Sequence, residues 1–128
     1  PMNLIVTNRR GNELTVGSTI LPLTPPATQT ASDVLLGVRP NAVTVSSAPV
    51  EGGLSGDVVM VEHVGADSII AVRLKDGRTA HDEDGDLDAV MVTVPGYCDL
   101  SIGQPVWATI DLGQAIFFAA KTGERIRQ

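Results

Sequence analysis

Residues 54–75 read LSGDVVMVEHVGADSIIAVRLK, and this stretch decides the fold. Its first half, residues 58–64, is rich in β-branched valines that fall on both faces of a strand, so we expect it to be covered on two sides. Residues 70–74 then alternate apolar with small or charged side chains, the period of a strand with one core face. The Gly-Ala-Asp of residues 65–67 predicts a sharp bend or a β-bulge. A long, bent strand that pairs with its successor is typical of a small closed barrel.

Short alternating segments on both sides of this stretch predict further strands. Turn-forming residues separate them, beginning with the Asn-Arg-Arg-Gly-Asn of residues 8–12, and residues 25–32 are predicted to be an exposed connection. Helix signals are weak, and we expect at most one helical turn near residues 112–115. We expect the strands near residues 3–7, 14–16, 19–23, 34–38, 43–45, 87–94, 106–110 and 116–118. The pattern therefore predicts an all-β protein.

The composition describes one domain with an aliphatic core. The chain has 128 residues, of which 43% are hydrophobic and only 3% aromatic. Its 13 glycines and 8 prolines suit many short strands joined by turns. The longest apolar runs fall well short of the roughly 18 residues that a membrane span requires, and we see no signal peptide. The single cysteine, Cys98, excludes an internal disulfide, and we interpret it as a buried or partly buried small hydrophobe.

The net charge of −6 argues against nonspecific binding to nucleic acid. Much of it comes from one acidic loop, in which Asp82, Asp84, Asp86 and Asp88 alternate with other residues. Alternating carboxylates make this loop a weak candidate for a calcium site. The glycine and the closing glutamate of a calcium loop are not at the required positions, however, so we favour a solvated acidic loop.

No arrangement of residues predicts catalysis. The phosphate-binding motif of ATPases, G-x-x-x-x-G-K-[ST], is absent. His63 and His81 lack the neighbours of a catalytic triad, and Cys98 lacks a second cysteine. Trp107 either caps the core from outside or marks a contact surface. We therefore expect no enzymatic activity from this chain.

Four short motifs in order carry a resemblance to a known family. GDVVMVEHVGADSIIAVRL, with GVRP upstream and VPG and TGERI downstream, resembles the C-terminal regulatory domain of carbohydrate-importing ABC transporter ATPases, called TOBE for transport-associated OB. The resemblance implies OB-fold-type (TOBE/MOP-like) barrels built from interleaved N- and C-terminal strands. Residues 1–128 would form one composite domain, with N-terminal strands over 1–46, the main OB unit over 54–118 and an acidic insertion over 79–88. The matched motif positions are Gly37, Arg39, Pro40, Glu62, His63, Gly65, Asp67 and Gly123.

The resemblance also implies a function without catalysis. The chain would be the regulatory and dimerisation domain of the ATP-binding subunit of a sugar importer. Its partners would be a second copy of itself, an upstream ATPase domain absent from this chain and, through that domain, the membrane subunits of the transporter. ATP and Mg would bind only in the ATPase domain, so no cofactor is expected here. The expected location is cytoplasmic, at the inner face of the cell membrane.

A second hypothesis comes from the related molybdate-binding OB domains, which hold a small oxyanion with backbone N–H groups and small hydroxyl side chains, typically between subunits. Ser68 is similar in position to a serine of that pattern. The Ser-Ala-Arg-Asn signature that usually opens those domains is missing before Gly56. A small-oxyanion binding module is therefore the alternative function.

Overall fold

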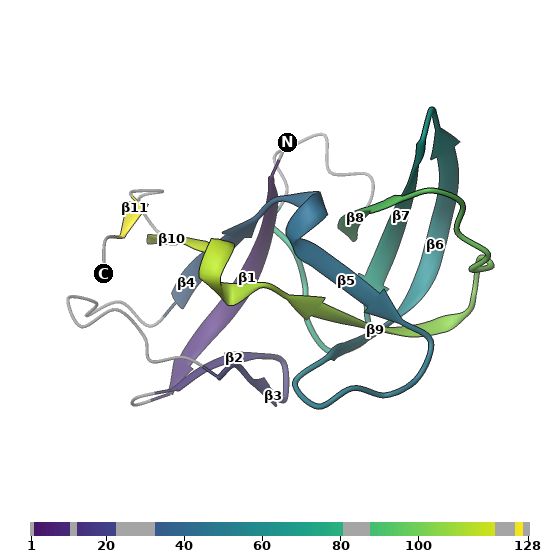
Figure 1. Ribbon diagram of the computed structural model, residues 1–128. Coiled ribbons are helices and arrows are strands. Elements are labelled where there is room, and N and C mark those ends of the chain that lie inside the picture. The colour runs from purple at the N-terminus through teal and green to yellow at the C-terminus, as the bar shows by residue number, and fades with distance from the viewer. Residues whose placement is uncertain (1, 11–12, 23–32, 81–87, 120–124, 127–128) are drawn as a thin grey trace.

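The computed structural model describes residues 2–10, 13–22, 33–80, 88–119 and 125–126, and within them it is all-β. Two antiparallel sheets account for the strands, and the only helical pieces in these ranges are the 3-10 turns η1 (Pro40–Ala42) and η2 (Leu112–Gln114) (Figure 1). The strands are β1 (Asn3–Arg10), β2 (Glu13–Val16), β3 (Thr19–Ile20), β4 (Asp33–Val38), β5 (Val43–Ser46), β6 (Leu54–Val64), β7 (Asp67–Leu74), β8 (Val90–Pro95), β9 (Pro105–Ile110), β10 (Ile116–Ala119) and β11 (Arg125–Ile126). The prediction of an all-β fold is confirmed, and η2 lies at the helical turn expected near residues 112–115, whereas η1 is a second turn that was not expected.

Strands from the two ends of the chain interleave in the first sheet, whose order is β11-β10-β4-β1-β2-β3. Leu36 on β4 lies opposite Ile5 of β1 on one side and Phe117 of β10 on the other. The second sheet has the order β5-β9-β6-β7-β8, and its edge strands β5 and β8 contact each other. A sheet whose edges meet in this way is a small barrel, so the OB-type prediction is confirmed.

The chain turns sharply at the Gly-Ala-Asp segment, as predicted, but it does so in a hairpin turn between two strands, and the alternative of a β-bulge at this point is wrong. β6 and β7 pair antiparallel down to Val64 and Asp67, which leaves Gly65 and Ala66 as a two-residue loop. Gly65 has a φ of 62°, and a glycine in this region at the first loop position is the pattern of a type II′ turn. The bulge lies earlier, where the register shifts between Val58 and Met60. A glycine is compatible with all three structures, and only strand pairing selects one of them.

The half of β6 that follows this bulge is not covered on two sides, contrary to the sequence prediction. Val58 is fully buried, but burial declines along the strand and Val64 is 47% exposed. The reason is that β9 pairs with β6 only up to Asp57, so the hairpin extends beyond the rest of the sheet (Figure 1). Residues 8–10 of the predicted turn at residues 8–12 instead belong to β1, which continues to Arg10, and residues 11–12 lie outside the described residues.

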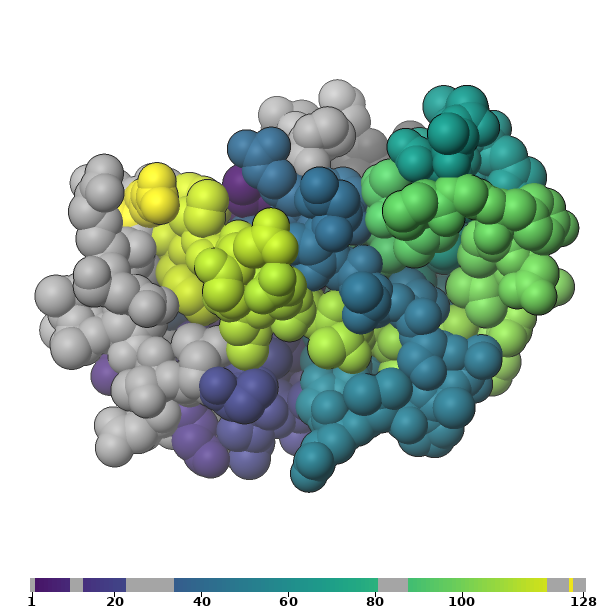
Figure 2. Space-filling model, in the orientation of Figure 1, coloured from purple at the N-terminus to yellow at the C-terminus, as the bar shows by residue number. Residues whose placement is uncertain are grey.

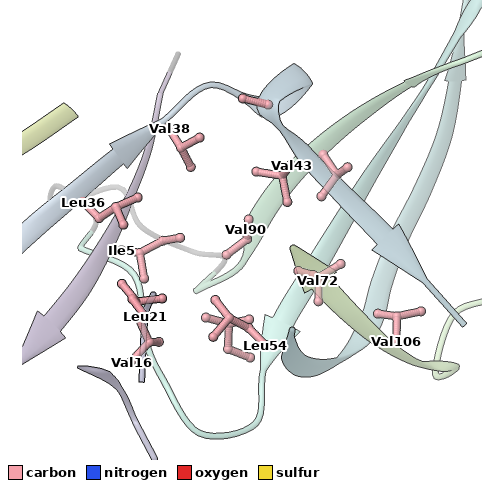
Figure 3. Packing of buried hydrophobic residues seen from close by; sticks show 14 of the residues in the cluster. Ile5, Val16, Leu21, Leu36, Val38, Val43, Leu54, Val72, Val90 and Val106 are labelled. Carbon is pink, nitrogen blue, oxygen red and sulfur yellow. The ribbon is translucent and has the colours of Figure 1, made fainter. Parts of the chain in front are cut away.

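One aliphatic core runs between the two sheets. Figure 3 shows Ile5, Leu36 and Val16 from the first sheet beside Val90 and Val72 from the second. Apolar residues at every second position supply this core from both sheets, as the alternation predicts. Among the described residues, no buried side-chain nitrogen or oxygen lacks a hydrogen-bond partner. The described part of the core therefore contains no unpaired polar group that a bound ligand would have to satisfy.

Asn3 joins the first sheet to the edge of the second. Its side-chain amide donates to the carbonyl oxygen of Met91 at 2.8 Å, and its Oδ1 accepts from the Met91 N–H at 2.8 Å. An amide that makes both bonds replaces the peptide group of a missing neighbouring strand. Each sheet also combines strands from both of the expected segments, residues 1–46 and 54–118. β5 of the first segment pairs with β9 of the second, and β4 of the first pairs with β10.

Candidate functional site

Several of the motif positions meet at the tip of the β6–β7 hairpin. Glu62 and His63 lie at the end of β6, and Asp67 begins β7 directly after the Gly65 turn. Cross-strand pairing sets His63 opposite Ser68 on the core-facing side, whereas Glu62 faces the other side. The tip is therefore built by a tight turn, which fixes His63 and Ser68 against each other.

Ser68 is the buried centre of a short hydrogen-bond chain. Its side chain is 0% exposed, and its Oγ donates to the carbonyl oxygen of Gly96 at 2.7 Å. The Nδ1 atom of His63 lies 3.0 Å from the same Oγ. A hydroxyl has one proton, so the bond from His63 must come from an Nδ1–H group. The hydroxyl proton of Ser68 is directed to Gly96 and is not available to a bound anion.

Tyr97 covers this chain of bonds from outside. Its ring stacks on that of His63 with centroids 4.8 Å apart and an angle of 16° between the planes. The Tyr97 side chain is nevertheless 80% exposed. In Figure 2 the segment that follows β8 lies against the tip of the hairpin, and the Gly96 N–H donates to the carbonyl oxygen of Ala66. Gly96 entered the sequence analysis only as the last residue of the VPG motif, and Tyr97 was not singled out, because their contacts with the hairpin join segments some 30 residues apart.

Replacing Ser68 with alanine should lower the free energy of unfolding by about 1–2 kcal/mol, because it removes a buried hydrogen-bonded hydroxyl. His63→Ala should cost less, since the His63 side chain is exposed. The double variant should cost less than the two single changes together, because both remove the same bond. Urea denaturation of the four proteins measures this coupling. Strict additivity would show that the His63–Ser68 bond does not contribute to stability.

The other motif positions lie away from this tip. Gly37 is in the middle of the first sheet, where an added Cβ would meet the Sδ of Met2 at 2.5 Å and a ring carbon of Phe118 at 2.9 Å. Arg39 is exposed after β4, and Pro40 begins η1. Gly123 lies outside the described residues. The motif positions therefore do not form one site, and Gly37 is explained by close packing.

The structure describes only the end of the predicted acidic loop. Asp88 accepts hydrogen bonds at its Oδ1 from the backbone N–H of Thr79 at 2.8 Å and from its hydroxyl at 2.6 Å. Thr79 itself forms an antiparallel β-bridge with Ile5, so the start of the expected insertion lies alongside β1. His81, Asp82, Asp84 and Asp86 lie outside the described residues. Within the residues that the structure does describe, no group of histidine, cysteine and acidic side chains could hold a metal ion.

A polar hollow lies beside β1, at the point where its pairing with β2 ends and the segment after β7 runs along it instead. The hollow has a volume of about 230 Å³ and is lined by Val6, Asn8, Gly17, Asp76, Gly77 and Arg78. The Val6 N–H donates to the carbonyl oxygen of Arg78 at 3.0 Å, which holds this segment against β1. The sequence did not reveal this hollow, because its walls come from two distant parts of the chain.

Asp76 lines this hollow and is hydrogen-bonded to Ser18. Hydrogen bonding from the side chain and the backbone N–H of Ser18 holds the pKa of Asp76 below its usual value of 3.8, although desolvation opposes this effect. The N–H bond is 2.9 Å long. The close approach of the two segments depends on Gly17, because a Cβ at this position would overlap the backbone carbonyl of Asp76.

This pKa shift predicts a pH-dependent stability. A carboxylate whose pKa is lower in the folded protein than in the unfolded chain stabilises the folded state at pH values above its unfolded-state pKa. That contribution disappears as the pH falls through the folded-state pKa. We expect Asp76→Asn to be less stable than the wild type at neutral pH. The two melting temperatures should converge as the pH falls below 3.8. Thermal unfolding across this range tests the prediction, and a constant difference at every pH would contradict it.

A second hollow is smaller and mainly apolar. It has a volume of about 80 Å³, and Leu54, Ile110 and Leu112 form much of its wall. Glu51 supplies the one charged side chain of this lining, and no cationic residue belongs to it. The hollow therefore does not favour a small anion.

The structure also shows the surroundings of Cys98 and Trp107, two residues that the sequence analysis singled out. Cys98 is partly buried and packs against the core, which confirms its interpretation as a small hydrophobe. Trp107 is half-buried on β9, between Ser46 of β5 and Ser55 of β6.

In the described part of the chain, no helix is long and apolar enough to cross a membrane.

Comparisons with known proteins point to one family and one fold. The family model described as "TOBE domain" matches residues 36–118. No curated protein matches the chain by sequence. Among solved structures, the chain is similar to the cytoplasmic molybdate-binding protein ModG in a crystal form with molybdate bound, with a TM-score of 0.62 and 15% sequence identity. The alignment covers 90% of this chain and 94% of ModG, so the two folds correspond over nearly their whole length.

Proposed function

The chain belongs to the TOBE domain family, and from this premise we propose that it is a non-catalytic binding module for a small tetrahedral oxyanion. The observation that carries the proposal is the near-complete correspondence with ModG, which covers 90% of this chain. TOBE domains and ModG are binding modules, and the chain supplies no phosphate-binding ATPase loop. We further propose that residues 1–128 act as one composite domain, a view that the Asn3–Met91 bonds between the sheets support.

The test is the thermal stability of the protein with millimolar sodium molybdate, sulfate or phosphate. A ligand that binds only the folded protein, present at 100 times its dissociation constant, stabilises by about 2.7 kcal/mol, so the melting temperature should rise by several degrees. Sodium chloride at matched ionic strength is the control. If no oxyanion exceeds the chloride effect, the proposed function is wrong.

A second candidate is the regulatory and dimerisation domain of the ATP-binding subunit of a sugar importer, acting in the cytoplasm at the inner face of the membrane. The observation that favours it is the outer face of the β6–β7 hairpin. Met60 and Ile69 are only half-buried there, and Val64 is 47% exposed. Strand pairing places these three side chains on one face, which a second copy of the chain would cover.

This candidate predicts weak self-association. Sedimentation velocity should show a monomer at low concentration and a growing dimer fraction as the concentration rises. Val64→Asp should reduce the dimer fraction, whereas Val50→Asp, an equal change at an exposed valine in the β5–β6 loop, should not. A strictly monomeric wild type up to millimolar protein would contradict this candidate, and it would leave the oxyanion proposal untouched.

A further inference from the structure

We propose that the hollow beside Arg78 is the binding site of the oxyanion, and this inference rests on the proposed function. Ser68, the position suggested by the sequence, cannot serve, because its hydroxyl proton is already donated to Gly96. The apolar hollow has only the carboxylate of Glu51 as a charged group. Among these three places, the hollow beside Arg78 is the one that offers a cation.

The lining of this hollow carries one cation, Arg78, and one carboxylate, Asp76. The Asp76 carboxylate accepts a hydrogen bond from the backbone N–H of Ser18 at 2.9 Å. The Arg78 side chain, by contrast, is exposed and makes no hydrogen bond or ion pair with any described residue. A guanidinium group can bind two oxygens of one tetrahedral anion side by side. Arg78 therefore supplies the charge, and Asp76 holds the wall in place.

The shape of the hollow fits a small ligand. Its volume of about 230 Å³ is below the roughly 300–1,000 Å³ of sites for drug-sized molecules. Gly17 and Gly77 allow two turns to approach closely here, because a Cβ on Gly77 would meet the side chain of Val16 at 2.7 Å. Asn8 adds a polar side chain to the lining. A free oxyanion with part of its hydration shell fits this space, and we propose that class of ligand.

The matched variants are Arg78→Gln, Arg78→Lys and Arg125→Gln. Arg125 is also an exposed arginine of the first sheet, but β10 and β4 separate its strand from β1, a distance of about 14 Å at the usual strand spacing. Both glutamine variants therefore remove one positive charge, and only one of them removes it from the hollow. Arg78→Lys keeps the charge and loses the paired geometry.

Calorimetric titration with sodium molybdate, sulfate and phosphate should show binding to the wild type. Arg78→Gln should weaken it by about 10-fold or more, the usual loss for a hydrogen bond to a charged group, and Arg125→Gln by less than about 2-fold. Arg78→Lys should fall between them. In NMR spectra, the backbone amide signals of Gly17, Gly77 and Arg78 should move on addition of the anion.

The possible failures are distinguishable. If the wild type binds an oxyanion but the two glutamine variants bind equally well, the site lies elsewhere and the proposed function stands. If the wild type binds none, both the site and the proposed function are wrong. O-phosphoserine is a further probe, and tighter binding of it than of inorganic phosphate would overturn the assignment to a free oxyanion.

Discussion

Gly17→Ala is expected to lower the free energy of unfolding by about 3 kcal/mol or more, because steric overlap adds to backbone strain. Gly17 has a φ of 58°, a conformation that alanine adopts only at a cost. A Cβ at this position would also overlap the backbone carbonyl of Asp76, and backbone cannot move aside as a flexible side chain can. The change should therefore separate the turn at Gly17 from the segment after β7. Urea denaturation gives the loss in free energy.

Gly52→Ala is the matched control for this prediction. Gly52 has a φ of 78°, but an added Cβ would meet nothing within 4 Å. Its substitution should therefore cost only the strain of the left-handed conformation, about 1–2 kcal/mol. If Gly17→Ala costs no more than Gly52→Ala, the close contact between Gly17 and Asp76 does not exist in solution.

Leu36→Ala should cost about 2–5 kcal/mol, since it opens a cavity in a close-packed core. Leu36 is 0% exposed and lies on the central strand pair of the first sheet, opposite Ile5 and Phe117. The loss is a large fraction of the 5–15 kcal/mol by which small domains are usually stable. It should appear as a lower urea midpoint with an unchanged slope.

The neighbouring Leu35 provides the control, because the same atoms are removed from the opposite face of the strand. Leu35 is only half-buried, so Leu35→Ala should cost clearly less than Leu36→Ala. Equal losses would mean that the two faces of β4 are equally buried, for instance because a second molecule covers the outer face. Sedimentation velocity of the wild type at the same concentration would reveal such an assembly.

The candidate site was only partly predictable, and the reason differs from residue to residue. Gly65 marked a turn correctly, but the choice between bend, bulge and hairpin depended on how β6 and β7 pair. Ser68 was noticed as a small hydroxyl residue. That its proton is committed to Gly96 depends on a segment 28 residues further along the chain. Arg78 gave no signal, because its significance depends on Asn8 and Gly17 across the hollow.

The sequence by itself determined where most of the strands lie and, in the regularly alternating strands, which side chains enter the core. Alternation is a local property, since neighbouring side chains of a strand point to opposite faces, and Ile70, Val72 and Leu74 are buried as it predicts. It also determined the all-β class and the family, through motifs that read directly along the chain.

Only the tertiary structure decided which strands pair, how far each is covered and where polar groups converge. Any strand offers the same backbone N–H and C=O groups, so the pairing of β4 with β10 follows from fitting all apolar faces into one core. The same fitting leaves the end of β6 beyond its partner β9 and sets Arg78 beside Asn8 at the edge of β1. These contacts join residues far apart in sequence, and no local pattern encodes them.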